Sequence, residues 1–138
     1  MREPVGRKMN KIAKMFQAQL QKELRHLDID RSFYPLLLIE SGNGITQQEL
    51  AMQLHCNKVQ VVRIIDYLSS NGYVERVQNT EDKRKHVLTI TEKAALLMPD
   101  IHQVIKTTSD SAFEGLSENK INELYEMLDI IENNLVSE

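Results

Sequence analysis

The chain has 138 residues and a formal net charge of −3, with 41% hydrophobic and 27% charged residues. This composition is typical of a soluble globular protein, and every apolar run is shorter than the roughly 20 residues that span a bilayer. No signal-peptide pattern opens the chain, and a single cysteine excludes an internal disulfide. We therefore expect one domain with an extension, in a reducing cytoplasm and without a membrane segment.

The charge is distributed unevenly along the chain. Residues 1–25 contain seven basic and two acidic side chains, whereas residues 109–138 contain one basic and eight acidic ones. Because the acidic residues are concentrated at the C-terminal end, the negative net charge does not exclude a locally positive surface that binds nucleic acid.

The first expected element is a long amphipathic helix over residues 5–27, with apolar residues at steps of three and four. Two interpretations stay open: a core helix with a solvated back, or a helix that also packs against a second subunit. Asp28-Ile-Asp30 should end this helix, and Asp30 can cap the next segment. Residues 31–40 are almost continuously apolar, with Pro35 in the first turn, and this predicts a short buried helix.

Two helical patterns joined by a tight turn follow. Thr46 and Glu49 have the spacing of a capping box, which predicts the start of the first helix. Asn57 is a good N-cap for the second helix, which should run towards a stop at Gly72. The order of helix, sharp turn and helix is that of a helix-turn-helix unit.

The turn between these helices contains His55 and Cys56. Such turns often need a residue with positive φ, and histidine is among the few side chains that adopt it, so we expect His55 there. Cys56 should point inwards as a small hydrophobic residue. The alternative, a redox sensor with a lowered thiol pKa at a helix N-terminus, stays open.

The second helix has one apolar and one polar face. Val61, Ile64, Ile65 and Leu68 recur at helical spacing and should be buried. A helix with a buried back and a cationic front, placed after a sharp turn, is suited to the major groove of DNA. The residues expected to face the groove are Asn57, Lys58, Val59, Gln60, Val62 and Arg63.

Two strand-like runs, residues 73–77 and 86–91, flank a charged loop and predict a β-hairpin wing. Asp82 is placed to pair with Arg76 and to stiffen the loop. Arg84 should then reach the narrow minor groove, where arginine is favoured. The residues of this loop that are expected to contact DNA are Lys83, Arg84 and Lys85.

Two more helices are expected after the hairpin, capped by Thr91 and Ser117. The last one carries an apolar seam with no partner in the winged unit, so it should meet its counterpart in a homodimer. We therefore expect dimerisation helices at residues 1–30 and 92–138, and a DNA-binding domain at residues 31–91. The seam consists of Ile121, Leu124, Leu128, Ile131 and Leu135.

The chain resembles the MarR family of winged helix-turn-helix transcription regulators from end to end. The most specific stretches are Leu68-Ser-Ser-Asn-Gly-Tyr-Val-Glu-Arg76 and the wing sequence Asp82-Lys-Arg84 followed by Leu88-Thr-Ile-Thr-Glu92. The resemblance implies a mainly α fold, a bacterial or archaeal cytoplasmic protein, and a homodimer that binds a pseudo-palindromic operator, usually as a repressor. It also implies relief by a small aromatic effector, or by an oxidant in branches with a cysteine in the first helix, which this chain lacks.

The same resemblance places an effector pocket where the first, second and fifth helices meet the winged unit. An aromatic pair on the short second helix supports this placement. The residues expected to line the pocket are Phe16, Tyr34 and Ile101.

Two other classes of function compete with this interpretation. The first is a winged-helix module for protein assembly that does not bind DNA. Val59 and Val62 favour it, because they lie on the face where a DNA-binding helix usually has polar groups. In a DNA-binding protein, the methyl groups of these two valines could instead contact thymine methyl groups. An enzyme is disfavoured, because the four histidines show no metal-ligand spacing and no glycine-rich phosphate loop is present. We expect no catalytic residues, no metal and no cofactor.

Overall fold

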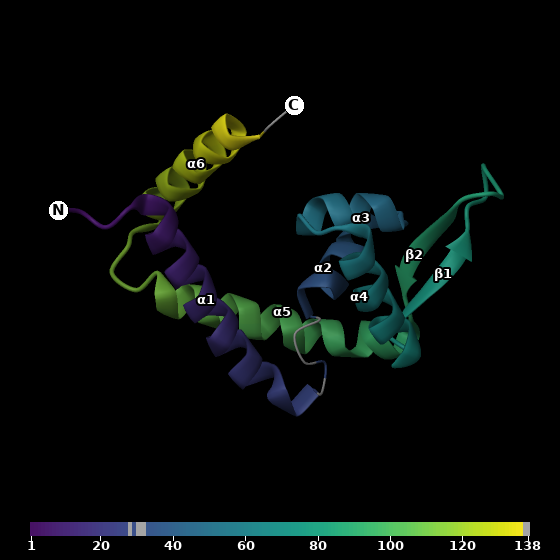
Figure 1. Cartoon of the computed structure of the whole chain (residues 1–138). Helices are drawn as coiled ribbons and strands as arrows, with labels where there is room; N and C mark the ends of the chain where they lie inside the picture. Colours follow the sequence, from purple (N-terminus) through teal and green to yellow (C-terminus); the bar gives the residue numbers. More distant parts are fainter. Residues whose placement is uncertain (28, 30–32, 137–138) are drawn as a thin grey trace. The chain divides into compact units, whose positions relative to one another are not determined.

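The computed structural model describes residues 1–27, 29 and 33–136, and Figure 1 shows how their helices and strands are arranged. The fold is the predicted one, mainly helical with a small antiparallel hairpin. The expected helix end at Asp28 and Asp30 lies outside the described residues. In chain order the elements are α1 (Val5–Leu24), the 3-10 turn η1 (Arg25–Leu27), α2 (Phe33–Gly42), α3 (Gln47–Leu54), α4 (Lys58–Ser70), β1 (Val74–Gln78), β2 (His86–Ile90), α5 (Glu92–Ala112) and α6 (Glu118–Leu135).

The helix boundaries follow the capping residues. The backbone N–H of Glu49 donates to the Thr46 hydroxyl at 3.1 Å and opens α3. At the end of α4, Gly72 has φ +77°, and the N–H of Tyr73 donates to the carbonyl of Leu68 at 2.9 Å. This six-to-one bond satisfies an otherwise unpaired carbonyl at the helix end. The expected start of α3 and end of α4 are both confirmed.

The hairpin is joined to the helices by a third strand-like segment. β1 and β2 pair antiparallel with Arg76 opposite Leu88, and the Leu88 N–H also donates to the carbonyl of Ile45 at 2.7 Å. Ile45 lies immediately before the N-cap of α3, so this bridge ties the base of the wing to the start of the helix-turn-helix. The position of the wing relative to α3 and α4 is therefore fixed by backbone hydrogen bonds.

One hydrophobic core lies behind the helix-turn-helix. In Figure 1, α2, α3 and α4 gather beside the hairpin, and the first part of α5 passes beneath them. The buried side chains come from every one of these elements and from the end of α1. The core anchors the back of α4, as predicted from its apolar spacing. Its fully buried large members are Leu24, Ile29, Leu36, Ile39, Ile45, Leu50, Val61, Ile65, Leu68, Leu88 and Ile101.

The chain divides into two compact units, Met1–Ile105 and Lys106–Glu138. In the second unit, Ser117 caps α6 as predicted, with the Lys120 N–H donating to its hydroxyl at 3.3 Å. The rings of Phe113 and Tyr125 meet edge to face at 6.4 Å. No side chain of α6 is fully buried: within the seam Ile121 and Leu124 are half-buried, and the last three members are exposed. None of the described helices is long and apolar enough to cross a membrane.

Candidate nucleic-acid interface

The turn of the helix-turn-helix has the predicted geometry. His55 has φ +52° and ψ +43°, and its backbone N–H donates to the carbonyl of Met52 at 3.2 Å. The next N–H, of Cys56, donates to the carbonyl of Ala51 at 3.1 Å. Cys56 is half-buried and packs against the hydrophobic core, which agrees with the inward hydrophobic role expected for it. This tight turn sets the direction in which α4 leaves α3.

A reciprocal capping box opens α4. The Asn57 amide oxygen accepts the backbone N–H of Gln60 at 2.8 Å, and the Gln60 amide oxygen accepts the backbone N–H of Asn57 at 3.0 Å. Sequence reasoning found the Asn57 cap but missed the role of Gln60. The signal was present, because a capping residue followed three positions later by glutamine is the spacing of this motif. Both amide oxygens are therefore turned towards the backbone.

The expected groove-facing side of α4 lies at the surface. Asn57, Lys58, Gln60 and Arg63 are exposed, and the isopropyl group of Val59 is 62% exposed. The structure differs from the expectation in part for Val62, which is half-buried. The front of α4 thus brings together two cationic side chains, two amides and one exposed aliphatic group.

The expected brace between Arg76 and Asp82 is replaced by two other ion pairs. The Arg76 guanidinium lies 3.6 Å from the carboxylate of Asp66 on α4, and Asp82 pairs instead with Arg84 at 3.2 Å. The strand register explains why Arg76 does not pair with Asp82. Arg76 sits in the middle of β1, opposite Leu88, where it can reach α4, whereas Asp82 lies in the loop beyond the strand ends. Arg76 therefore ties the wing to α4.

The wing tip is ordered by two short side chains. The Asn79 amide oxygen accepts the backbone N–H groups of Glu81 and Asp82 at 2.8 and 3.3 Å. One carboxylate oxygen of Asp82 accepts both the backbone N–H and the Nε–H of Arg84, at 3.1 and 3.2 Å. The Arg84 side chain, then its backbone N–H, and then the charge of Lys85 hold the pKa of Asp82 below its ordinary value of 3.8.

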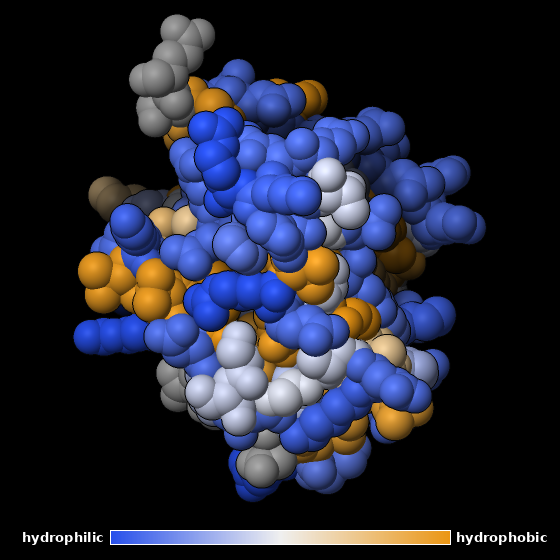
Figure 2. Space-filling view, turned by 90° about the vertical axis from the view of Figure 1, so that its right-hand side faces the viewer, coloured by the Kyte–Doolittle hydropathy of each residue, from blue (hydrophilic) through white to orange (hydrophobic). Residues whose placement is uncertain are grey.

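The three basic residues predicted to contact DNA are all exposed at this tip. The side chain of Arg84 remains 91% exposed although its Nε is held by Asp82, and Lys83 and Lys85 flank it. Figure 2 shows the molecule from the side on which the wing lies, and this face is largely hydrophilic with separate hydrophobic residues. A guanidinium held at its base and exposed at its end is well placed to contact a phosphate or a narrow groove.

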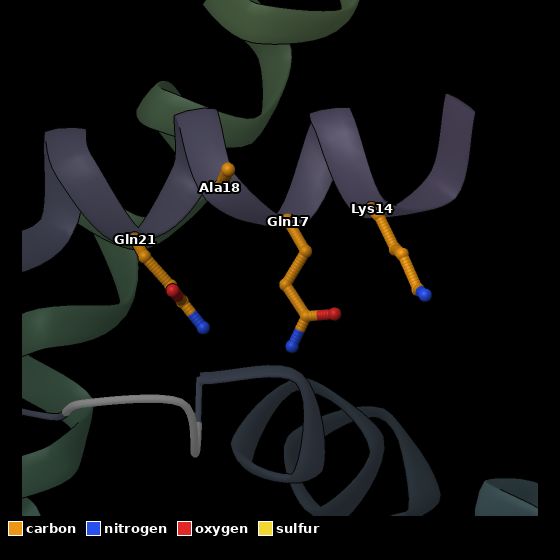
Figure 3. Close-up of a pocket in the computed structure, with 4 residues that line it drawn as sticks. All are labelled: Lys14, Gln17, Ala18 and Gln21. Carbon is orange, nitrogen blue, oxygen red and sulfur yellow. The ribbon is translucent and has the colours of Figure 1, made fainter. Parts of the chain in front are cut away.

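The three residues predicted for an effector pocket occupy different environments. Ile101 is completely buried in the core, Phe16 is half-buried, and Tyr34 is 51% exposed. A cleft of about 280 Å³ lies along α1 and is lined by Lys14, Gln17, Ala18 and Gln21. Figure 3 shows the three longer side chains pointing to the same side of α1 and Ala18 pointing away from them. Three of its four lining residues have polar side chains, and none of the three predicted residues lines it.

Other polar contacts join helices far apart in the sequence. His102 on α5 lies 2.7 Å from the carboxylate of Glu40 on α2, a pairing that the sequence did not suggest. Within the described residues, no three histidine, cysteine, aspartate or glutamate side chains gather as a metal site would require.

The helix-turn-helix, with its exposed cationic helix and its basic hairpin, defines a winged helix-turn-helix protein. The model of the MarR family matches residues 31–86, which cover α2, the helix-turn-helix and most of the wing. The resemblance to the MarR family of transcriptional regulators seen in the sequence is confirmed for this part of the chain.

Solved structures extend the similarity over nearly the whole chain. A putative MarR family transcriptional regulator from Listeria monocytogenes, in complex with 26mer DNA, is 27% identical; the match has a TM-score of 0.89 and covers 98% of this chain and 90% of that one. A mutant of MarR from E. coli in complex with operator DNA is also 27% identical, with a TM-score of 0.81 and 93% of each chain covered. The regulator SlyA, at 23% identity and a TM-score of 0.88 over 96% of this chain and 94% of that one, shares the fold.

Proposed function

We propose that this chain is a homodimeric transcriptional regulator that binds a pseudo-palindromic operator. In this proposal α4 enters the major groove of each half-site and the wing enters the neighbouring minor groove. The observation that carries it is that α4, with its exposed polar face, is joined by the ion pair between Asp66 and Arg76 to the hairpin whose tip exposes Arg84. The relatives that were solved with DNA support the same interpretation.

The roles of the two DNA contacts differ. Base edges are distinguishable in the major groove, so Lys58, Gln60 and Arg63 would specify the sequence. The minor groove presents a degenerate pattern and a variable width, so Arg84 would sense shape and electrostatic potential. Lys83 and Lys85 would add contacts to the phosphates, which position the protein without specifying a sequence.

Dimerisation is supported by the apolar surface that the chain leaves uncovered. On α6, Leu128 and Ile131 are 37% and 36% exposed, and Leu135 is 76% exposed. A contiguous apolar stripe at a three-four repeat is costly in water and is typical of a helix that packs against another copy. Two copies would present two α4 helices to two half-sites, which is why the operator should be pseudo-palindromic.

We further propose that the protein acts as a repressor and that a small aromatic compound weakens its binding to DNA. This part rests on the family and not on a formed cavity at Phe16, Tyr34 and Ile101. Addition of aromatic acids to the protein tests it: an effector should raise the melting temperature and lower operator affinity. If both quantities stay unchanged over a panel of such acids, this part of the proposal fails.

The deciding experiment is a DNA-binding titration at several salt concentrations, with duplexes enriched from a random pool. A regulator should enrich a two-fold symmetric sequence. The logarithm of its DNA-binding constant should also fall linearly with the logarithm of the salt concentration, because each phosphate contact releases counterions. The exposed Val59 favours a second candidate, an assembly module without DNA binding. That candidate predicts no enriched sequence and no salt-dependent retention of DNA.

A further inference from the structure

The capping box of α4 restricts which hydrogen bonds this helix can offer to DNA. In the first two turns of α4, residues 58–65, the only side chain with an acceptor is Gln60. Its amide oxygen already accepts the Asn57 N–H, and the oxygen of Asn57 accepts the Gln60 N–H. Because both oxygens are directed to the backbone, the groups that these two amides leave without a partner in the capping box are their NH₂ groups, which are donors.

The remaining polar groups on this face are donors as well. Lys58 carries an ammonium and Arg63 a guanidinium, and neither has an acceptor. One turn further along, the carboxylate of Asp66 would be an acceptor, but it lies 3.6 Å from the guanidinium of Arg76. The reading face of α4 is therefore a donor surface, and the acceptors near it are directed to the protein itself.

Val59 adds an apolar element to this donor surface. It is the second residue of α4, beside the cap, and is 62% exposed. An isopropyl group can make no hydrogen bond, but it can cover the methyl group of thymine in the major groove. Burying one methyl-sized group stabilises a complex by roughly 0.8 kcal/mol, or about a fourfold gain in affinity.

We infer that α4 reads its half-site through hydrogen-bond acceptors and thymine methyl groups on the base edges, and leaves the exocyclic amino groups of adenine and cytosine unread. The bidentate pairing of an amide with adenine requires a free amide oxygen as well as the NH₂ group. In the intact capping box, each oxygen of Asn57 and Gln60 already accepts a backbone N–H and is directed to the start of α4, so an adenine amino group would have to share it. Guanine offers two acceptors, and thymine offers one acceptor and the methyl group.

This inference rests on the proposed function, and the experiment separates the two. Duplexes are first enriched from a random pool with the full-length protein. Absence of any enriched sequence contradicts DNA recognition as a whole. With an enriched duplex in hand, each base of a half-site is replaced singly by an analogue that lacks one major-groove group, and affinity is measured by competition with the unmodified duplex.

Three analogues distinguish the groups that are read. 7-Deazaguanine removes an acceptor and should weaken binding about fivefold or more at a contacted guanine. Uracil removes the thymine methyl and should cost about threefold to fourfold where Val59 lies. Purine without the 6-amino group, in place of adenine, removes a donor and should change affinity less than about twofold in a duplex that remains paired. Amino-group deletions that cost as much as acceptor deletions would overturn the inference.

Two protein variants with matched controls assign the effects to named side chains. Gln60→Glu keeps an acceptor for the Asn57 N–H, so the capping box remains, but it replaces the outward NH₂ by an oxygen. In this variant the loss of affinity caused by 7-deazaguanine should therefore become smaller at one position of the half-site. The control Gln53→Glu adds the same charge on α3 and should show the same loss as the wild type. Val59→Ala should lose the preference for thymine over uracil, whereas Val77→Ala on β1 should retain it. If Gln60→Glu and Val59→Ala behave like their controls, the assignment is wrong.

Discussion

One carboxylate oxygen of Asp82 accepts both the backbone N–H and the side-chain Nε–H of Arg84, at 3.1 and 3.2 Å. The aspartate thus fixes the backbone turn and the base of the arginine together, while the side chain of Arg84 stays 91% exposed. Holding a long side chain in one direction reduces the conformational entropy that it would lose on binding. The pair therefore holds Arg84 in a direction suited to the minor-groove contact proposed for the wing tip.

Arg84→Ala should weaken specific and non-specific DNA binding together. Its contact would sense groove width and negative potential, so its loss should make the salt slope shallower by about one unit per half-site. The measurement is a titration against enriched and scrambled duplexes at several salt concentrations. The control is Arg7→Ala, which removes an exposed arginine beside Glu3 on α1 and should change neither slope. Selective loss of the enriched duplex alone would contradict the role given to Arg84.

The order of the wing tip should depend on pH only in the acidic range. Because the pKa of Asp82 is lowered by Arg84, its stabilising contribution is complete above the ordinary value of 3.8 and is lost as pH falls through the lower value in the folded protein. The backbone amide signal of Arg84 in an NMR titration should therefore shift below pH 3.8 and not between pH 5 and 8. In Asp82→Asn that transition should disappear, and a shift near neutral pH would show that another group governs the wing.

His55→Gly should leave stability unchanged or raise it by a few tenths to about 1 kcal/mol. The left-handed conformation at φ +52° is strained for histidine and free for glycine, although glycine also makes the unfolded chain more flexible. Urea unfolding measures the difference. The matched variant His55→Ala keeps a Cβ at that position and should be about 1 kcal/mol less stable than His55→Gly. A clear loss of stability in His55→Gly would mean that the imidazole makes a needed contact.

Asn57→Ala should destabilise the protein by about 0.5–2 kcal/mol, because α4 loses the acceptor for the Gln60 N–H. Asn57→Asp should restore most of that stability, since a carboxylate caps a helix as well as an amide does. Thermal unfolding of the three proteins checks this. Equal stability of wild type and Asn57→Ala would show that the capping box does not hold α4.

Leu128→Asp combined with Ile131→Asp should convert the dimer into monomer or aggregate and abolish binding to the enriched duplex. Two carboxylates on the apolar seam of α6 would have to be desolvated in a dimer interface. The control, Asn122→Asp combined with Asn133→Asp, adds the same charge on the opposite side of the helix and should leave the dimer intact. Sedimentation measures the molecular mass. A native-sized dimer in the seam variant would exclude this interface.

Residues near one another in the sequence determined most of the secondary structure. The N-caps Thr46, Asn57 and Ser117 and the positive φ of His55 follow from chemistry within one or two turns, so the starts of α3, α4 and α6 could be predicted. The apolar spacing along α4 likewise indicated which face is buried, and the wing sequence indicated which basic residues are exposed. These features can be predicted without knowing which helices and strands pack against one another.

The tertiary structure decided which groups meet across the fold. Arg76 could have paired with any nearby carboxylate. The register of β1 against β2 places it in the middle of the strand, away from Asp82 in the loop, and there it pairs with Asp66 on α4. The bridge from Ile45 to Leu88 and the contact between Glu40 and His102 join segments more than 40 residues apart. Such contacts depend on how the packed core orients whole elements. Local propensity carries no information on that orientation, because it is set by the sum of many buried contacts and not by any one stretch of the sequence.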